Sequence, residues 1–393
     1  MTVDDNERGW ARIMRIGGWA GEGFGAVADA FAAVLPEDGR GGGAVALYVD
    51  GEPVVDLWGG TADVRTGRAW EPETAALVFS CAKGITSLLV HHLVQEGRVD
   101  LDAPVARYWP EFAAAGKEDV TVRHVLTHRA GLPVVDAALT FEDVLAWTPV
   151  VETLEKQAPL WEPGSAHAYH GLTFGWLAGE VIRRVTGSTP GAYFRELLGD
   201  PLGLDTWIGL PAAEFARLAP LEEPTDPVPM PGPEHLLVRA LTMNGALEFP
   251  GADSTHGYGT PAFLAAEVPA GNAVSTARGL AGAYAAAATG LHGLPRLLTR
   301  ETVTEAVREQ TSGPSWPDGM DFGGRWGSGF HIDAPPAWSA LGPRSFGHDG
   351  AGGNTAFGDD EFGVGFAFVT SRMVGLGDDR AERLVAAVRG CLG

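Results

Sequence analysis

The amino-acid sequence predicts an α+β fold, an α/β sandwich in which one antiparallel sheet is flanked by helices and interrupted by a helical insertion. Strand-like runs lie near both ends of the chain, within residues 44–58 and 345–370. The sequence between them is dominated by helical periodicity. No period of about 20–50 residues recurs, which argues against a repeat architecture.

The first strands are predicted on either side of the Asp-Gly dipeptide at 50–51. The runs at 44–49 and 53–58 are rich in β-formers. Asp-Gly between two such runs is a strong signal for a β-hairpin. A short amphipathic helix over 25–35 should precede the hairpin, and the glycine pair at 59–60 should end it.

A helix is predicted to begin at Ser80. Apolar residues recur at helical spacing between Ile85 and Val94, and Gly97 stands where a helix commonly stops. The helix is apolar on most faces, which indicates that it is buried. Ser80 therefore lies at the N-terminus of a buried helix, and Lys83 lies one turn later on the same face.

Two further helices carry recognisable end signals. Thr121 is placed to cap a short helix that ends before Gly131. Residues 172–186 have helical periodicity, and Gly187 is the expected terminator.

The last part of the sequence again contains runs of strand-forming residues. An alanine-rich helix capped by Ser275 or Thr276 should run through Ala288. Strands are predicted at 345–349, 355–358 and 364–370, and a final helix at 378–389.

The chain of 393 residues is longer than one compact core usually holds, so two domains are expected. The predicted division is an α/β domain formed by residues 1–105 and 270–393 and a mainly helical insertion domain, residues 106–269, that carries Tyr169.

Composition and charge exclude several classes of function. A net charge of −22 argues against nucleic-acid binding and against docking on an anionic membrane. Two cysteines, Cys81 and Cys391, are too few for a disulfide framework. His91 and His92 are adjacent on a helix and cannot share a face, so no metal site is expected. No secretory signal or spanning segment is evident, and cytoplasmic residence is the expectation.

Ser80 and Lys83 form the most informative chemical pattern in the sequence. The free N–H groups and the positive dipole end of a helix favour negative charge that develops on the serine oxygen. A buried lysine loses proton affinity because desolvation disfavours its charged form. A serine and a lysine so placed make an activated nucleophile, and S-x-x-K is a signature of penicillin-recognising enzymes.

Tyr169 is the best candidate for a partner of this pair. It lies in a polar, glycine-containing break between helical stretches. A protonated Lys83 nearby should depress the pKa of the phenol, which favours a base role.

A run of small residues at 347–353 follows a predicted strand. Such a run lets a ligand approach the backbone closely, and its N–H groups could join that of Ser80 in an oxyanion hole. His348 and Asp349 are adjacent on a strand and should point to opposite faces, so a Ser-His-Asp triad is not expected.

Together these residues resemble the serine β-lactamase/penicillin-binding-protein superfamily, and in particular the class C β-lactamase-like esterases called family VIII carboxylesterases. Stretches typical of that family lie at 97–105, 126–133 and 346–353. The resemblance implies an α/β sandwich with a helical insertion and an active site in the cleft between them. It implies no metal or organic cofactor.

The resemblance also implies roles for single residues. Ser80 would be the acylated nucleophile, and Lys83 and Tyr169 would jointly take its proton. The backbone N–H groups of Ser80 and Ala351 would hold the oxyanion. The candidate substrate-binding residues are His348, Asp349, Gly350, His170 and Trp326.

Two departures from the family pattern bear on the substrate. Gly171 replaces the asparagine of Tyr-x-Asn, and His348-Asp349-Gly350 replaces Lys-Thr-Gly. The lysine that would pair a substrate carboxylate is therefore absent, and histidine is at most partly charged near pH 7. Both changes favour neutral acyl esters over carboxylate-bearing β-lactams or peptides.

The sequence thus predicts a serine hydrolase that cleaves small-molecule esters or amides, with carboxylic esters of short acyl groups as the first choice. An acyltransferase of the same fold is the alternative. A β-lactamase or DD-peptidase, and a catalytically silent binding protein, are less favoured. The oligomeric state is not predicted.

Overall fold

The computed structural model describes residues 16–224, 229–250, 254–312, 314–316, 324–375 and 377–393. Its main feature is a nine-stranded antiparallel sheet in the order β1-β3-β2-β15-β14-β13-β12-β11, with β4 paired to β3. The strands are β1 Gly17–Ala20, β2 Gly42–Val49, β3 Glu52–Asp63, β4 Arg68–Ala69, β11 Arg325–Trp326, β12 His331–Ile332, β13 Ser345–Gly350, β14 Asn354–Asp359 and β15 Val364–Thr370.

The sheet joins the two ends of the chain, as the sequence predicts. β2 pairs with β15 in a register that places Ala46 opposite Ala367. The predicted hairpin and all three predicted C-terminal strands are present. The expectation that the glycines at 59–60 end the hairpin is wrong: they pair with the glycines at 42–43, and β3 continues to Asp63. Glycines on both strands permit this close approach of the two backbones.

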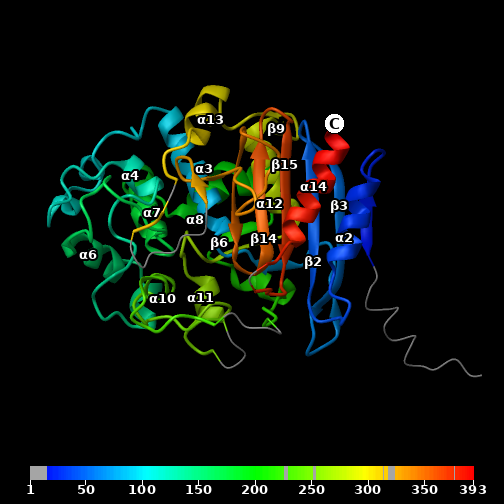
Figure 1. Ribbon diagram of the computed structural model, residues 1–393, viewed down its shortest axis with the longest axis horizontal. Helices are drawn as coiled ribbons and strands as arrows, with labels where there is room; N and C mark the ends of the chain where they lie inside the picture. Colours follow the sequence, from blue (N-terminus) through cyan, green and yellow to red (C-terminus); the bar gives the residue numbers. More distant parts are fainter. Residues whose placement is uncertain (1–15, 225–228, 251–253, 313, 317–323, 376) are drawn as a thin grey trace, which may run out of the picture.

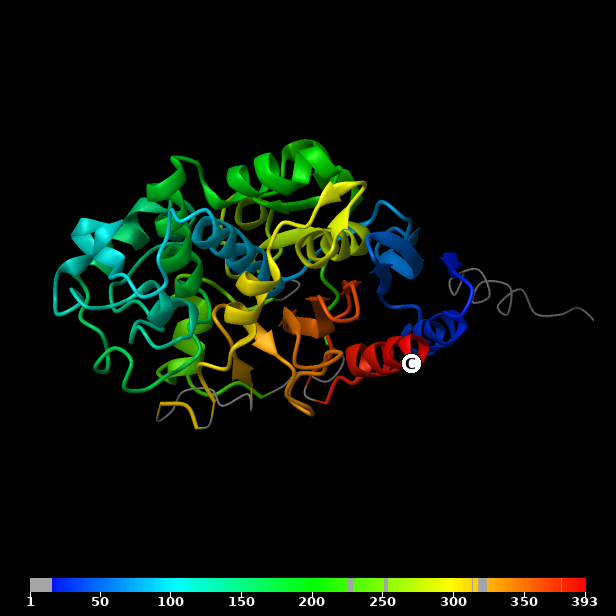
Figure 2. The same cartoon turned by 90° about the horizontal axis from the view of Figure 1, so that it is seen from above.

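Different helices cover the two faces of the sheet. α2 (Gly25–Val34) and α14 (Arg380–Leu392) lie side by side on one face, and α3 (Cys81–Gln95) and α12 (Ala277–Ala288) lie on the other (Figures 1 and 2). Because both faces are buried, β2 reads as one continuous apolar run rather than as an alternating strand.

The alanine-rich character of α12 follows from how closely it approaches the sheet. A Cβ atom added to Gly365 of β15 would come within 2.4 Å of the carbonyl oxygen of Ala281. Only small side chains fit between elements at this separation. Thr276 caps the helix by accepting from the N–H of Gly279, as the sequence predicts.

The remaining helices form the block on the left of Figure 1 and the segments that join it to the sheet. Thr121 caps α4 (Val122–Leu126) in a capping box with His124, and Gly187 ends α7 (Thr173–Thr186) in the left-handed conformation, both as predicted. The remaining helices are α4 Val122–Leu126, α5 Phe141–Leu145, α6 Thr148–Lys156, α7 Thr173–Thr186, α8 Pro190–Phe194, a π-helical turn η3 Arg195–Gly199, α9 Asp200–Leu202, α10 Leu236–Thr242, α11 Pro261–Ala265 and α13 Arg300–Val307. The described ranges also contain four 3-10 turns: η1 Val105–Arg107, η2 Pro110–Ala113, η4 Ala212–Arg217 and η5 Ala351–Gly353.

A small second sheet, which was not predicted from the sequence, lies beside α3. Its order is β6-β8-β5-β7, from β5 Ala75–Leu77, β6 Thr206–Ile208, β7 Leu218–Ala219 and β8 Ala273–Ser275. A separate two-stranded ribbon joins β9 Gly290–Leu291 and β10 Leu294–Pro295. Strands of two or three residues are too short to leave a period in the sequence.

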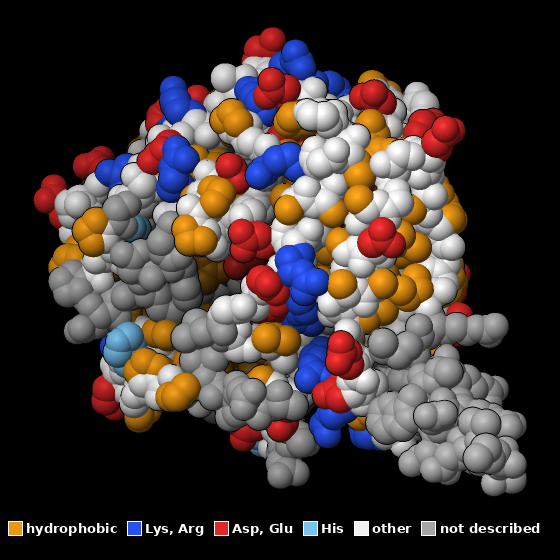
Figure 3. Space-filling view, turned by 45° about the vertical axis from the view of Figure 1, so that its right-hand side comes forward, with side chains coloured by type: hydrophobic (Ala, Val, Ile, Leu, Met, Phe, Trp, Pro, Cys, Tyr) orange, Lys and Arg blue, Asp and Glu red, His pale blue; other side chains and the backbone are white. Residues whose placement is uncertain are grey.

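One hydrophobic cluster contains both Leu89 of α3 and Trp176 of α7, so the predicted α/β and helical units pack on a shared core. The domain boundaries proposed from the sequence remain a prediction. Within the described ranges, no helix combines the length and apolarity needed to cross a bilayer. Acidic and basic side chains are interspersed on the face shown in Figure 3.

Candidate active site

Ser80 stands at a strand–turn–helix junction. It is the N-cap residue of α3, three residues beyond the end of β5. Phe79, the residue before it, has a φ of +46°, a conformation that non-glycine residues rarely adopt. Such strain costs on the order of 1–3 kcal/mol and tends to occur at functional sites. The aromatic ring of Tyr258, 5.8 Å from that of Phe79, packs against this turn.

Lys83 is fully buried, and its amine has three oxygen neighbours. Nζ lies 2.6 Å from the carbonyl oxygen of Gly171, 2.8 Å from that of Ala270 and 3.1 Å from Oγ of Ser80. A neutral amine has two N–H donors and one lone pair. If both donors serve the carbonyls, the lone pair faces the Ser80 hydroxyl.

The electrostatic environment supports the neutral form of Lys83. Burial lowers its pKa to about 7, although the charge of Asp349 acts in the opposite direction. The sequence-based expectation that burial lowers the proton affinity of this lysine is confirmed in direction. Near pH 7, a substantial fraction of the amine is therefore available to accept a proton.

Tyr169 approaches the same hydroxyl from the segment between α6 and α7. Its phenol donates to Oγ of Ser80 at 2.9 Å, and Nζ of Lys83 lies 4.7 Å from its ring centre. Burial, together with the negative charge of Asp349, raises the pKa of Tyr169 well above its usual value. The expected depressed pKa is thus contradicted: desolvation of the phenolate outweighs the effect of the nearby amine, whose own pKa is lowered to about 7.

An aromatic cluster fixes the Tyr169 ring. The ring of Trp326 stacks on it at 5.5 Å and 27°, and the ring of His128 lies 4.9 Å away. His128 also accepts the backbone N–H of His170 at 3.2 Å through Nδ1. Trp326 is therefore close to the catalytic candidates, as expected. Its described ring contacts are with other side chains of the protein.

His170 does not face open space. It is fully buried, and Nε2 accepts the N–H of Leu132 at 3.1 Å while Nδ1 lies 2.7 Å from the carbonyl oxygen of Ala168. Both ring nitrogens are thus committed to the backbone. This geometry speaks against the substrate-binding role expected from the sequence and gives His170 a structural role.

The small-residue run forms the end of β13 and the turn η5 beside Ser80. A Cβ atom on Gly350 would come within 2.2 Å of the carbonyl oxygen of Val78, so only glycine fits there. The thiol of Cys81 donates to the carbonyl oxygen of His348 at 3.3 Å. These contacts bring Ala351, the residue after Gly350, next to the turn that carries Ser80.

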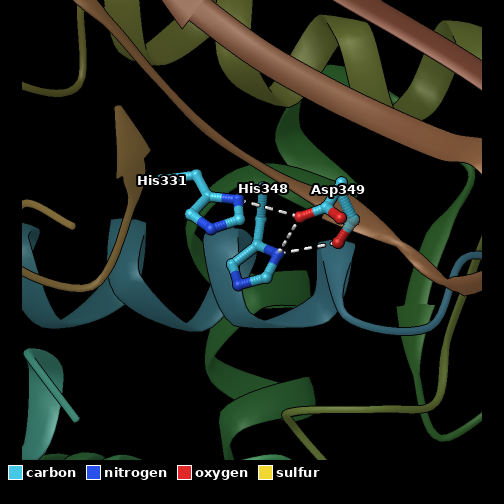
Figure 4. A group of neighbouring side chains, drawn as sticks. All are labelled: His331, His348 and Asp349. Atoms are coloured by element: carbon cyan, nitrogen blue, oxygen red, sulfur yellow. Dashed lines mark hydrogen bonds and ion pairs between the residues drawn. The ribbon is translucent and has the colours of Figure 1, made fainter. Parts of the chain in front are cut away.

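His331, His348 and Asp349 form a cluster above helix α3 (Figure 4). Oδ1 of Asp349 lies 2.9 Å from Nδ1 of His331 and 3.3 Å from Nδ1 of His348. The expectation that the side chains of His348 and Asp349 point to opposite faces is therefore wrong. The strict alternation of a strand weakens where it ends, and β13 ends at Gly350. The described side-chain hydrogen bonds of Ser80 are nonetheless to Lys83 and Tyr169.

His331 is a site residue that was not predicted from the sequence. It lies in the two-residue strand β12, and its register partner on β13 is Gly347. Its ring stacks between Trp326, at 3.7 Å, and His348, at 4.9 Å. No spacing in the sequence links it to Asp349, because the pairing of the two strands alone brings them together.

The ligand atoms of these three residues lie within 4.8 Å of one another, as in some metal sites. However, the two imidazole rings are nearly parallel, at 20°, so their in-plane lone pairs run side by side instead of converging on one ion. Nδ1 of His348 lies nearer to the backbone carbonyl oxygen of Asp349, at 2.7 Å, than to its carboxylate. The contacts fit a carboxylate that lies beside two imidazole rings better than they fit a metal site. Burial would raise the pKa of Asp349, but its two histidine neighbours hold it well below its usual range.

Comparison with known proteins identifies the family. A profile of the beta-lactamase family matches residues 26–390. The chain belongs to the beta-lactamase family. It is 38% identical over 369 residues to the protein named esterase/beta-lactamase LipL of Mycobacterium tuberculosis, across 92% of this chain and 84% of that one.

Solved structures of this family agree over nearly the whole chain. A family VIII carboxylesterase superposes with a TM-score of 0.84 at 35% identity, covering 96% of this chain and 100% of the other. A penicillin-binding-protein homologue from Caulobacter crescentus gives 0.85 at 36%, with the same coverage. The resemblance and the β-lactamase/transpeptidase-like fold predicted from the sequence are confirmed, and the protein is an enzyme of the serine hydrolase type.

Proposed function

We propose that the protein hydrolyses carboxylic esters of short acyl groups through a covalent acyl-enzyme on Ser80. One observation carries this proposal. The Ser80 hydroxyl lies between the amine of Lys83, at 3.1 Å, and the phenol of Tyr169, at 2.9 Å. A hydroxyl so held has a base to take its proton and a second group to orient it.

In the first step, Lys83 takes the proton of Ser80 as Oγ attacks the ester carbonyl. The pKa of about 7 suits a general base that works near neutral pH. The backbone N–H groups of Ser80 and Ala351 would stabilise the oxyanion, aided by the N-terminus of α3. The bond to the alcohol then breaks.

Tyr169 keeps its proton at neutral pH because burial raises its pKa. It is therefore suited to donate that proton to the leaving alkoxide and to be reprotonated by the ammonium of Lys83. Water then attacks the acyl-enzyme by the reverse sequence of proton transfers, which releases the carboxylic acid and restores Ser80.

Two features support ester substrates. The relatives described above include proteins named as an esterase/beta-lactamase and a family VIII carboxylesterase. In addition, the position of the Lys-Thr-Gly lysine is occupied by His348, whose pKa burial lowers to about 4, so it carries no charge to pair a substrate carboxylate near neutral pH.

A p-nitrophenyl ester series of increasing acyl length, measured on the wild type and on Ser80→Ala, tests the proposal. We expect the highest kcat/KM for the shortest acyl groups and a loss of about 10³-fold or more in the variant. A serine-directed phosphonate should label Ser80 in mass spectrometry. Efficient cephalosporin hydrolysis with poor turnover of short esters would contradict the substrate assignment. Acyl transfer is read from product partitioning with an added alcohol.

A further inference from the structure

The carboxylate of Asp349 is the charged group that the proposed mechanism leaves unused. About half of the Asp349 side chain, 49%, is exposed, whereas the two histidines that hold it are nearly buried, at 6% for His331 and 2% for His348. The carboxylate thus contacts the two histidines on one side and is exposed to solvent on the other. Figure 4 shows it above the end of helix α3.

Asp349 is close to the reacting groups. The next residue, Gly350, packs against the carbonyl of Val78, two residues before Ser80. The charge of Asp349 reaches far enough to act on both Lys83 and Tyr169. A substrate bound to Ser80 would therefore meet the same field.

The positive charges around this carboxylate do not cancel it. Within the described part of the chain, the ion-pair partners of Asp349 are histidines alone. Arg380 reaches the neighbouring turn and donates to the carbonyl of Gly352 at 2.7 Å, but it is already paired with Asp378 at 2.7 Å. Lys83 and His348 are largely uncharged above pH 7.

We propose that Asp349 makes this site selective for esters that carry an ammonium group near the scissile bond. The proposal rests on the ester hydrolysis proposed above and names its substrate class. A half-exposed carboxylate held on one side by imidazoles attracts a substrate cation and repels a substrate carboxylate. Asp349 is then a specificity-determining residue, and His331, 2.9 Å from its carboxylate, positions it.

The test compares two esters of nearly equal shape and different charge, acetylcholine and its carbon analogue 3,3-dimethylbutyl acetate, at one fixed pH of about 8, where Lys83 and His348 are largely uncharged. The measured quantity is the ratio of their kcat/KM values. Because the esters differ in intrinsic reactivity, the ratio of the wild type is divided by that of Asp349→Asn. We expect a quotient of roughly tenfold, the order of magnitude of one charge acting near a protein surface.

Asp29→Asn is the matched control. Asp29 is an exposed residue of α2, on the other face of the main sheet, and its substitution removes the same charge. We expect the control to keep the wild-type ratio. An equal fall in both variants would mean that overall net charge attracts the cation, and an unchanged ratio in both would mean that Asp349 does not select substrates. Either result overturns the proposal.

Binding to the wild type provides a second measurement if Asp349→Asn does not fold, as judged by circular dichroism and thermal melting. Choline should inhibit at roughly tenfold lower concentration than 3,3-dimethylbutanol, and equal inhibition overturns the proposal. The two proposals fail separately. Ser80-dependent hydrolysis without charge preference removes only the selectivity, whereas hydrolysis that survives Ser80→Ala removes the proposed function.

Discussion

The amine of Lys83 lies 4.7 Å from the centre of the Tyr169 ring, and burial moves the pKa values of the two groups apart. The pKa of Lys83 falls to about 7, while that of Tyr169 rises well above its usual value. Near neutral pH the pair therefore consists of a partly free amine and an intact phenol. This divides the proton transfers between them: the lysine accepts from the nucleophile and the tyrosine donates to the leaving group.

The first prediction concerns the pH dependence of ester hydrolysis. Because the neutral amine of Lys83 is the active form, kcat/KM should rise with pH, about tenfold per unit below its pKa of about 7, and level off above it. Initial rates of ester hydrolysis, measured at a series of pH values on both sides of 7, give this profile. In Lys83→Arg the guanidinium stays charged, so activity should be lost by about 10³-fold at every pH. A flat wild-type profile through pH 7 would contradict the assignment of the base.

The second prediction separates the roles of Lys83 and Tyr169. Tyr169→Phe removes the phenol that contacts Ser80 Oγ but leaves the lysine, so we expect kcat to fall by about 10²–10³-fold with the rise near pH 7 retained. The measurement is a full pH–rate profile of the variant. If the rise disappears with the phenol, the group titrating near pH 7 is Tyr169 and not Lys83.

The third prediction concerns the close contact between Gly350 and Val78. In Gly350→Ala, the new Cβ would lie 2.2 Å from a carbonyl oxygen, so the end of β13 must shift away from the Ser80 turn. We expect a stability loss of about 1–3 kcal/mol by urea unfolding, together with reduced kcat. Gly342→Ala is the control, because no atom lies within 4 Å of its new Cβ. Equal effects of the two substitutions would rule out the steric explanation.

The fourth prediction concerns a buried carboxylate outside the active site. Glu180 of α7 is fully buried and accepts from Trp147 at 2.8 Å, from Arg183 at 2.8 Å and from Arg184 at 2.7 Å. Glu180→Ala leaves Trp147 and Arg183 without this acceptor, whereas Arg184 keeps Glu111 at 3.0 Å, and should cost about 3 kcal/mol in urea unfolding.

Glu152 supplies the matched control for this measurement. It forms an exposed pair with Lys156 at 3.5 Å on helix α6. Glu152→Ala should change the free energy of unfolding by less than about 1 kcal/mol. Similar losses for the two variants would show that burial does not determine the cost.

Local relationships in this protein were predictable from the sequence. The hairpin at Asp50-Gly51 depends on a dipeptide between two strand-like runs. Ser80 and Lys83 are in contact because residues three positions apart lie on the same face of a helix. In both cases the interacting groups are neighbours in the sequence, so their geometry follows from one element.

Relationships between distant segments were less predictable. His331 reaches Asp349 only because β12 pairs with β13, and β12 has two residues. The direction of the Tyr169 pKa depends on how deeply the phenol is buried, which aromatic neighbours such as Trp326 decide. Neither pairing nor burial depth leaves a periodic pattern in a short segment.

The pairing of β2 with β15 has a consequence for synthesis of the chain. β2 leaves the ribosome well before its partner β15, because residues 50–363 are synthesised between the two strands. During most of that time the hydrogen-bonding edge of β2 is open, and open edges invite association with other nascent chains. The yield of folded enzyme in cells should therefore depend on translation speed and on chaperones that shield this edge.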